Sequence, residues 1–213
     1  MTQYFPREFR ELGFVTRWGI ARTIQRQSVA EHMFFVAHYA RRTLDLLGYN
    51  EQEYPEVYLN VIKWAMDHDK PEGGTGDIQG PAKRHMLDET RAAIFENNYT
   101  HEIYGHNAAC SDDFVRRVVK FADILDEAMF VATDIQLGNK SLGDFKLIYF
   151  YASNMPVSQM ALDRLKLAWT AMVDAGDFNI EYTWDYAERT WREEVYGAIL
   201  HAQCGLSRIP QNP

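Results

Sequence analysis

Apolar residues recur along most of the chain with the three- and four-residue spacing of an amphipathic helix, whereas alternating runs typical of strands are scarce. The clearest helix start is Ser28-Val29-Ala30-Glu31, a capping box that predicts a helix beginning at Val29 and ending near Gly48. We expect one apolar stripe on this helix, formed by Phe35, Val36, Tyr39, Ala40, Thr43 and Leu46. The pattern predicts an all-α fold.

Further helices are predicted from the same spacing and from the residues that interrupt it. Pro71 and three nearby glycines end one helix at about Asp69, with His68 in its last turn, and Gly138 ends another. The expected helices span residues 54–69, 88–104, 112–138, 156–173 and 184–203. They predict a single domain over residues 1–213, a helical bundle whose last two helices are added at its carboxyl end.

The composition is typical of a globular protein, since 46% of the 213 residues are hydrophobic and 24% are charged. A formal net charge of −8, without a basic stripe, argues against a nucleic-acid-binding module. Cys110 and Cys204 fit no metal or redox spacing. The sequence contains neither a signal-peptide core nor an apolar run long enough for a membrane span. We therefore expect a cytoplasmic protein that binds neither nucleic acid nor membranes.

Four titratable residues occupy helix positions where an unpaired polar group is costly: His32, His68, Asp69 and Asp123. Each has an ordinary explanation. His32 would be a core histidine bonded to a carbonyl, and His68-Asp69 a pair that ends a helix. Asp123 would form an ion pair with Lys120 or an arginine. Together they offer two imidazoles and two carboxylates from three helices. Such a mixed set favours a divalent transition ion, such as Co, Mn, Zn, Fe or Ni.

The order His32…His68-Asp69…Asp123 resembles the H…HD…D signature of the HD-domain metal-dependent phosphohydrolases, which are all-α bundles. Within that superfamily the chain is closest to the bacterial 5'-deoxynucleotidase branch and to the similar phage dATP triphosphohydrolases. The supporting motifs lie within residues 17–127 and are Arg17-Trp18, Glu72, Thr75-Gly76-Asp77 and Pro81-Ala82-Lys83. The resemblance implies that His32, His68, Asp69 and Asp123 bind the metal.

Two acidic residues after the His-Asp pair are candidates for catalysis. A divalent ion in this set would activate a water near neutral pH and polarise a phosphoryl oxygen. Glu72 is placed to orient or deprotonate that water, and Asp77 to assist it or to protonate the leaving oxygen. A second ion, Mg or Mn, near Glu72 and Asp77 is a further expectation. The ordinary alternative is that both residues are solvated in a loop.

Five residues are expected to bind the substrate. Arg17 offers a planar guanidinium for phosphate and Lys83 a second positive charge. Trp18 is a candidate for stacking on a base, although packing at the edge of the core is the commoner use of an indole. Ile20 and Pro81 resemble the base pocket of the phage enzymes, where an isoleucine would admit adenine and reject a 2-amino group.

The leading hypothesis is hydrolysis of the 5'-phosphoester of a deoxyribonucleotide, which releases nucleoside and phosphate. The alternative is a phage-type dATP or dNTP triphosphohydrolase that releases triphosphate. A third hypothesis from another class is a nucleotide or metal sensor without activity. In each case we expect a small-molecule nucleotide as the ligand and a homo-oligomeric protein.

Overall fold

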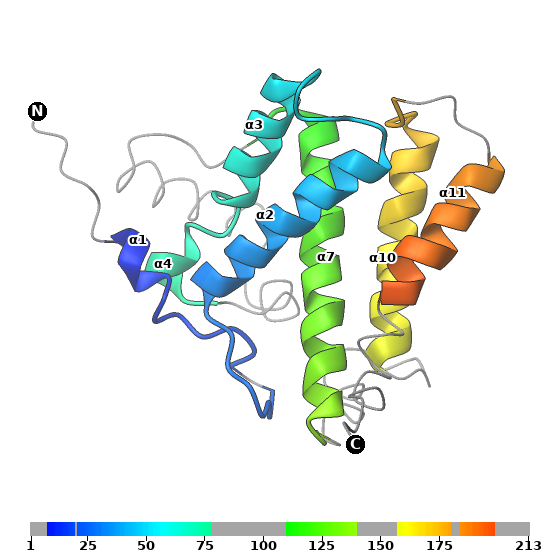
Figure 1. Ribbon diagram of the computed structural model, residues 1–213. Coiled ribbons are helices and arrows are strands. Elements are labelled where there is room, and N and C mark those ends of the chain that lie inside the picture. The colour runs from blue at the N-terminus through cyan, green and yellow to red at the C-terminus, as the bar shows by residue number, and fades with distance from the viewer. Residues whose placement is uncertain (1–7, 20, 78–109, 140–156, 180–183, 199–213) are drawn as a thin grey trace, which may run out of the picture.

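The computed structural model describes residues 8–19, 21–77, 110–139, 157–179 and 184–198. Every regular element in these ranges is a helix, which confirms the all-α prediction (Figure 1). The elements are α1 (Glu8–Glu11), α2 (Val29–Leu46), α3 (Pro55–Ala65), α4 (Glu72–Thr75), α7 (Asp113–Gln136), α10 (Val157–Asp174), α11 (Trp184–Thr190) and the π-helical turn η1 (Trp191–Tyr196). Among the described helices, none has the length and hydropathy that a bilayer crossing requires.

Helix α7 is the central element of the fold. It packs against α2 and α3 on one side and against α10 on the other (Figure 1). The main core lies along these contacts and includes the fully buried side chains Val36, Leu44, Val61, Val118 and Leu165. Burial of each such aliphatic side chain contributes about 1.5–3 kcal/mol to folding. The core therefore fixes the crossing of α2, α3 and α7.

Local capping interactions form where the sequence predicts them. The Ser28 hydroxyl accepts from the Glu31 amide at 3.2 Å, and the Glu31 carboxylate accepts from the Ser28 amide at 2.7 Å. The Asp112 carboxylate likewise accepts from the first amides of α7. Gly138 follows α7 with a φ of 96°, a conformation that glycine adopts at little cost. The predicted starts of α2 and α7 and the end of α7 are confirmed.

Two local predictions are wrong in detail. The buried side chains of α2 are Val29, His32, Met33, Val36, Ala40, Thr43 and Leu44, whereas Phe35 of the expected stripe is 42% exposed. The stripe is rotated because α2 meets both α3 and α7. Helix α3 ends at Ala65, so His68 lies in the turns that follow. The helix predicted at residues 88–104 and Cys204 lie outside the described residues.

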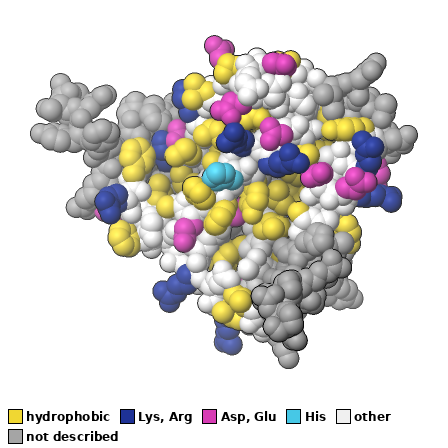
Figure 2. Space-filling model, viewed as in Figure 1, with side chains coloured by type: hydrophobic (Ala, Val, Ile, Leu, Met, Phe, Trp, Pro, Cys, Tyr) yellow, Lys and Arg dark blue, Asp and Glu magenta, His cyan; other side chains and the backbone are white. Residues whose placement is uncertain are grey.

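The carboxyl-terminal helices agree with the expected spans over the residues described. Helix α10 ends at Asp174, one residue beyond the prediction, and Gly176 follows with a φ of 71°. Helix α11 begins at Trp184 as expected and continues into η1, a π-helical turn that the sequence pattern does not predict. On the face shown in Figure 2, hydrophobic side chains gather where α2 meets α3, around a groove of about 1090 Å³.

Candidate metal centre

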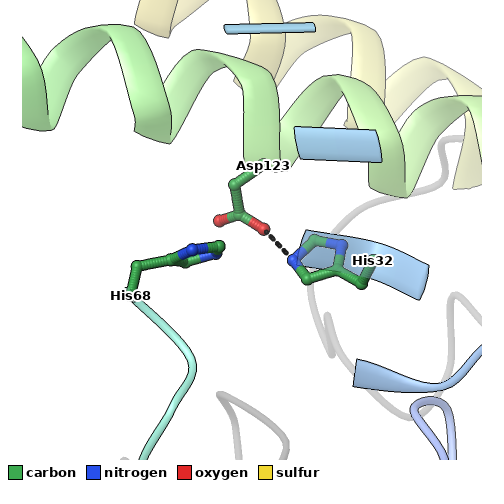
Figure 3. Close-up of side chains that lie close together, drawn as sticks. All are labelled: His32, His68 and Asp123. Atoms are coloured by element: carbon green, nitrogen blue, oxygen red, sulfur yellow. Dashed lines mark ion pairs between the residues drawn. The ribbon is translucent and has the colours of Figure 1, made fainter. Parts of the chain in front are cut away.

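Three side chains from distant parts of the chain converge beside α7. His32 lies in the first turn of α2 and is fully buried, His68 follows α3, and Asp123 lies in the middle of α7. One ligand atom from each lies within 4.8 Å of the other two (Figure 3). The crossing of α2 over α7 therefore brings together residues that are 91 positions apart in the sequence, from His32 to Asp123.

Asp69 completes the cluster. Its Oδ2 lies 3.4 Å from His32 Nε2 and 3.5 Å from His68 Nε2, while Asp123 Oδ1 lies 3.4 Å from His32 Nε2. Both Nε2 atoms are buried, and no hydrogen bond from the described residues reaches them. Two buried imidazole nitrogens that face two carboxylates fit a divalent transition ion, because buried polar atoms otherwise find a hydrogen-bond partner.

The other nitrogen of each imidazole is held by an acceptor. His68 Nδ1 donates to the Ala65 carbonyl oxygen at 2.8 Å, and His32 Nδ1 donates to Asp126 Oδ2 at 2.6 Å. A carbonyl or carboxylate oxygen can only accept, so Nδ1 carries a proton in both rings. Nε2 is then the nitrogen through which each ring, once neutral, can bind a metal.

The electrostatics of the cluster favour positive charge. Burial alone would lower the pKa of His32, but the carboxylates of Asp123, Asp126 and Asp69 around its ring raise it to about 10. Burial would raise the pKa of Asp69, yet the neighbouring His68 and His32 hold it below its usual range. The pKa of Asp123 is lowered in the same way, against its burial, by His32 and Lys120. The two carboxylates are therefore ionised at neutral pH and attract a cation.

Lys120 shares Asp123 with the cluster. The Lys120 ammonium lies 2.6 Å from Asp123 Oδ2, and the other carboxylate oxygen faces His32. Asp123 thus forms the ion pair with Lys120 that is its ordinary explanation, and it also faces the cluster that could hold a metal. Since Lys120 is 59% exposed, this ion pair is weakened by solvent.

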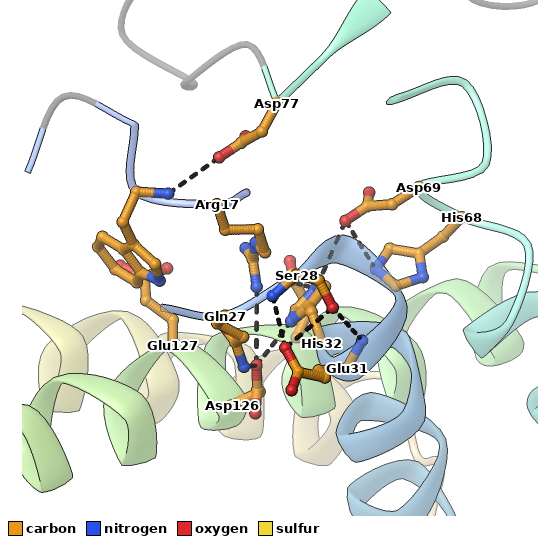
Figure 4. Close-up of polar contacts among 12 residues, drawn as sticks. Arg17, Gln27, Ser28, Glu31, His32, His68, Asp69, Asp77, Asp126 and Glu127 are labelled. Atoms are coloured by element: carbon orange, nitrogen blue, oxygen red, sulfur yellow. Dashed lines mark hydrogen bonds and ion pairs between the residues drawn. The ribbon is translucent and has the colours of Figure 1, made fainter. Parts of the chain in front are cut away.

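The two catalytic candidates lie in different environments. The sequence suggested a loop at Glu72, but this residue begins the short helix α4 and is buried. The chain turns back after Ala65, and the resulting hydrogen bond from the Glu72 amide to the Asp69 carbonyl ties α4 to the His-Asp pair. Asp77 Oδ2 accepts from the Trp18 amide at 3.1 Å (Figure 4). This contact anchors the segment that carries Arg17.

Arg17 faces the acidic cluster. Its Nη1 lies 3.6 Å from Asp126 Oδ2, and its side chain is only 15% exposed. Burial would lower the pKa of Arg17, but the surrounding carboxylates, Asp69 foremost, raise it above its usual value. The guanidinium is thus positively charged and lies beside the candidate metal site.

Trp18 packs into the protein. Its indole is 8% exposed and stacks on Phe130, with ring centroids 5.4 Å apart and 11° between the planes. The sequence left two uses open for this indole, packing at the core and stacking on a base. The contact with Phe130 is the packing use. The other base-pocket candidates, Ile20, Pro81 and the phosphate candidate Lys83, lie outside the described residues.

The chain matches a known protein family. The family described as "5'-deoxynucleotidase YfbR-like" matches residues 4–164, about three quarters of the chain. The chain belongs to this family.

Two phage proteins are similar in sequence to this YfbR-like chain. The dATP triphosphohydrolase of Salmonella phage PMBT28 is 35% identical over 131 residues, which is 59% of this chain and 64% of that protein. The dATP triphosphohydrolase of Acinetobacter phage SH-Ab 15497 is 40% identical over 84 residues, or 35% and 39% of the two chains. The matched part therefore spans less than two thirds of either relative.

Two solved structures share the fold. The cyanophage S-2L HD phosphohydrolase DatZ, bound to dA and one catalytic Zn²⁺ ion, has a TM-score of 0.55 and 19% identity, and the alignment covers 94% of this chain and 99% of DatZ. An HD-domain phosphohydrolase from Listeria innocua has a TM-score of 0.53 and 18% identity, with 91% and 87% covered. At this identity the likeness establishes the HD fold of the YfbR-like chain.

Sequence reasoning missed two residues beside the cluster, Asp126 and Gln27. Both are buried, and the Gln27 amide donates to Asp126 Oδ2 at 2.8 Å (Figure 4). Asp126 lies one turn after Asp123 and so shares its side of the helix. That spacing was the available signal for Asp126, whereas no pattern in the sequence marks Gln27.

Proposed function

We propose that this YfbR-like protein is a divalent-metal-dependent phosphohydrolase that cleaves the 5'-phosphoester of deoxyribonucleotides and releases nucleoside and phosphate. The observation that carries the proposal is the pair of buried Nε2 atoms of His32 and His68 facing Asp69 and Asp123. These four residues hold the ion, which is Zn, Mn, Co, Fe or Ni. When bound, the ion supplies Lewis acidity toward a phosphoryl oxygen and an activated water.

The remaining residues bind and position the substrate. Arg17 binds the phosphate oxygens, for which its guanidinium is well placed beside the cluster. Glu72, fixed at the start of α4, accepts the proton of the attacking water. Asp77 assists as the acid for the leaving oxygen, and with Glu72 it provides the place for a second ion, Mg or Mn. Lys83 adds positive charge at the phosphate.

Trp18, Ile20 and Pro81 form the base pocket in this proposal. The indole is covered by Phe130 on one face, so a base would meet its edge or its other face. The acidic net charge supports a small nucleotide as the substrate in place of a nucleic acid. We further propose that the enzyme is cytoplasmic and homo-oligomeric, and light scattering coupled to gel filtration measures the oligomeric state.

A second candidate is a triphosphohydrolase that releases triphosphate from dATP. The two phage relatives that carry this activity in their names favour it. The same side chains would act, but water would attack the phosphorus joined to the 5'-oxygen of a triphosphate. The length of the bound phosphate chain is the difference between the two candidates.

The decisive experiment incubates metal-loaded protein with dAMP and with dATP and identifies the released product. Phosphate from dAMP supports the monophosphatase, and triphosphate from dATP supports the second candidate. AMP and ATP test the preference for deoxyribose, and Asp113→Asn, an exposed change on α7, serves as the matched control. Binding of dATP without release of any product would contradict both and favour a sensor.

A further inference from the structure

Asp126 links three side chains through one oxygen atom. This residue of α7 is only 3% exposed. Its Oδ2 accepts from His32 Nδ1 at 2.6 Å and from Gln27 Nε2 at 2.8 Å, and it lies 3.6 Å from Arg17 Nη1 (Figure 4). Asp126 is not one of the four proposed metal ligands. Its contacts nevertheless reach one of those ligands and the proposed phosphate-binding residue.

The bond to Asp126 determines how His32 is presented to the cluster. A carboxylate accepts hydrogen bonds and cannot donate to Nδ1, so Nδ1 keeps its proton and Nε2 is the nitrogen left for an ion. The bond also fixes the rotation of the ring, because a turned imidazole would lose this acceptor inside a fully buried site. A carboxylate partner further makes the imidazole a stronger ligand.

Gln27 forms hydrogen bonds with both Asp126 and Arg17. Its side chain donates to Asp126, and its backbone carbonyl accepts from the Arg17 amide at 2.9 Å. The next residue, Ser28, caps α2 and pairs with Thr16 through an isolated bridge. A shift of Gln27 would therefore be transmitted to the arginine as well as to the carboxylate.

We propose that Asp126, supported by Gln27, is a positioning residue that directs His32 Nε2 toward the metal and sets the place of the Arg17 guanidinium beside it. The inference rests on the proposed metal-dependent function. It predicts that metal affinity depends on a residue that does not touch the metal.

The test measures Co²⁺ binding to metal-free protein by calorimetry and records the visible absorption of the bound ion. Asp126→Ala is expected to weaken binding by about 10–100-fold and to change the absorption bands, because the orientation of His32 is no longer fixed. Asp126→Asn keeps an acceptor oxygen for Nδ1 and is expected to recover part of the affinity. Gln27→Ala should weaken binding less than Asp126→Ala.

Glu127→Gln is the matched control. It removes a negative charge from the next residue of α7, whose carboxylate pairs with Arg164 on α10 and not with His32. Wild-type affinity and spectrum in this variant support the inference. Equal weakening in Glu127→Gln and Asp126→Ala would overturn it, as would wild-type affinity and spectrum in both Asp126 variants.

The two proposals fail in different ways. Wild-type protein that binds no Co²⁺ or other transition ion would contradict the proposed function. Wild-type protein that binds Co²⁺ while the Asp126 variants bind it equally well would contradict only this inference. A proton NMR signal from His32 Nδ1–H, slow to exchange and lost in Asp126→Ala, supports the contact without any metal. Absence of that signal in wild-type protein would overturn the inference.

Discussion

Two buried aspartates on α7, Asp126 and Asp134, differ in what they bind. Asp134 is fully buried and accepts from the backbone amides of Ile24 and Gln25, at 3.0 and 2.8 Å, and from the Asn139 side chain. The partners of Asp126 are instead the side chains of His32, Gln27 and Arg17. Burial is nearly the same at both positions.

The comparison shows that the chemistry of the partners, and not burial, separates a residue of the site from an anchor of the chain. Backbone amides are available anywhere, and a carboxylate that accepts them secures a loop. Asp126 instead contacts the His32 imidazole and the Arg17 guanidinium, to which we assign metal and phosphate binding. Asp134 thus holds the segment that leads to Gln27, whereas we propose that Asp126 positions side chains of the cluster.

The largest effect is expected at Asp123, which faces the cluster directly from the same helix. Asp123→Ala removes a proposed ligand oxygen and should abolish both metal binding and turnover. Elemental analysis of purified protein measures the metal, and the nucleotide assay measures turnover. Full metal occupancy in this variant would remove Asp123 from the ligand set.

Glu72→Ala should separate catalysis from metal binding. The residue begins α4 next to the His-Asp pair and is proposed to accept a proton. Loss of a general base lowers turnover by roughly 10²–10⁴-fold, while metal and nucleotide still bind. Rates of product release and Co²⁺ calorimetry on the same sample measure the two properties. Wild-type turnover would exclude this role for Glu72.

Metal affinity should increase with pH. The pKa of His32 in metal-free protein is about 10, so near neutral pH its ring carries an extra proton that a bound ion must displace. Below that pKa, affinity for Co²⁺ should rise about tenfold per pH unit for one displaced proton. Calorimetry between about pH 6.5 and 8 in buffers of different ionisation enthalpy counts the protons released. Affinity that does not change with pH would contradict the charged state inferred for His32.

Asp134→Ala should destabilise the protein and spare the metal site. It leaves the amides of Ile24 and Gln25 without their acceptor, which costs about 1–3 kcal/mol of unfolding free energy. Urea denaturation measures the loss, and Co²⁺ affinity of the folded protein should fall far less than in Asp126→Ala. A variant of full stability with weakened metal binding would reverse the roles assigned to the two aspartates.

The smallest effect is expected for Lys120→Gln. The exposed ion pair with Asp123 contributes below about 1 kcal/mol, and its removal frees one carboxylate oxygen. Stability should therefore change little, and Co²⁺ affinity should rise slightly. Arg116→Gln removes a similar exposed pair on α7, with Asp113, and is the control. A large loss of metal in Lys120→Gln would show that the lysine supports the site and does not compete for it.

Most of the fold follows from local patterns, and the errors occur where helices meet. The starts of α2 and α7 were predictable because a cap and its helix are neighbours in sequence. Phe35 was misassigned because the direction of the buried face depends on where the neighbouring helices lie. The same limit applies to His68, which was expected in the last turn of α3 and lies beyond its end.

The sequence by itself determined the helical class and the residue types able to bind a divalent ion, because both depend on local spacing and on donor chemistry. Only the tertiary structure decided that His32, His68, Asp69 and Asp123 lie close together. It also decided that Asp126 contacts His32, whereas Asp134 accepts from the backbone before α2. The physical reason is that these contacts are created where α2, the segment before it and the turns after α3 meet α7. A helical pattern states which residues share a face, but it does not state which partner that face will meet.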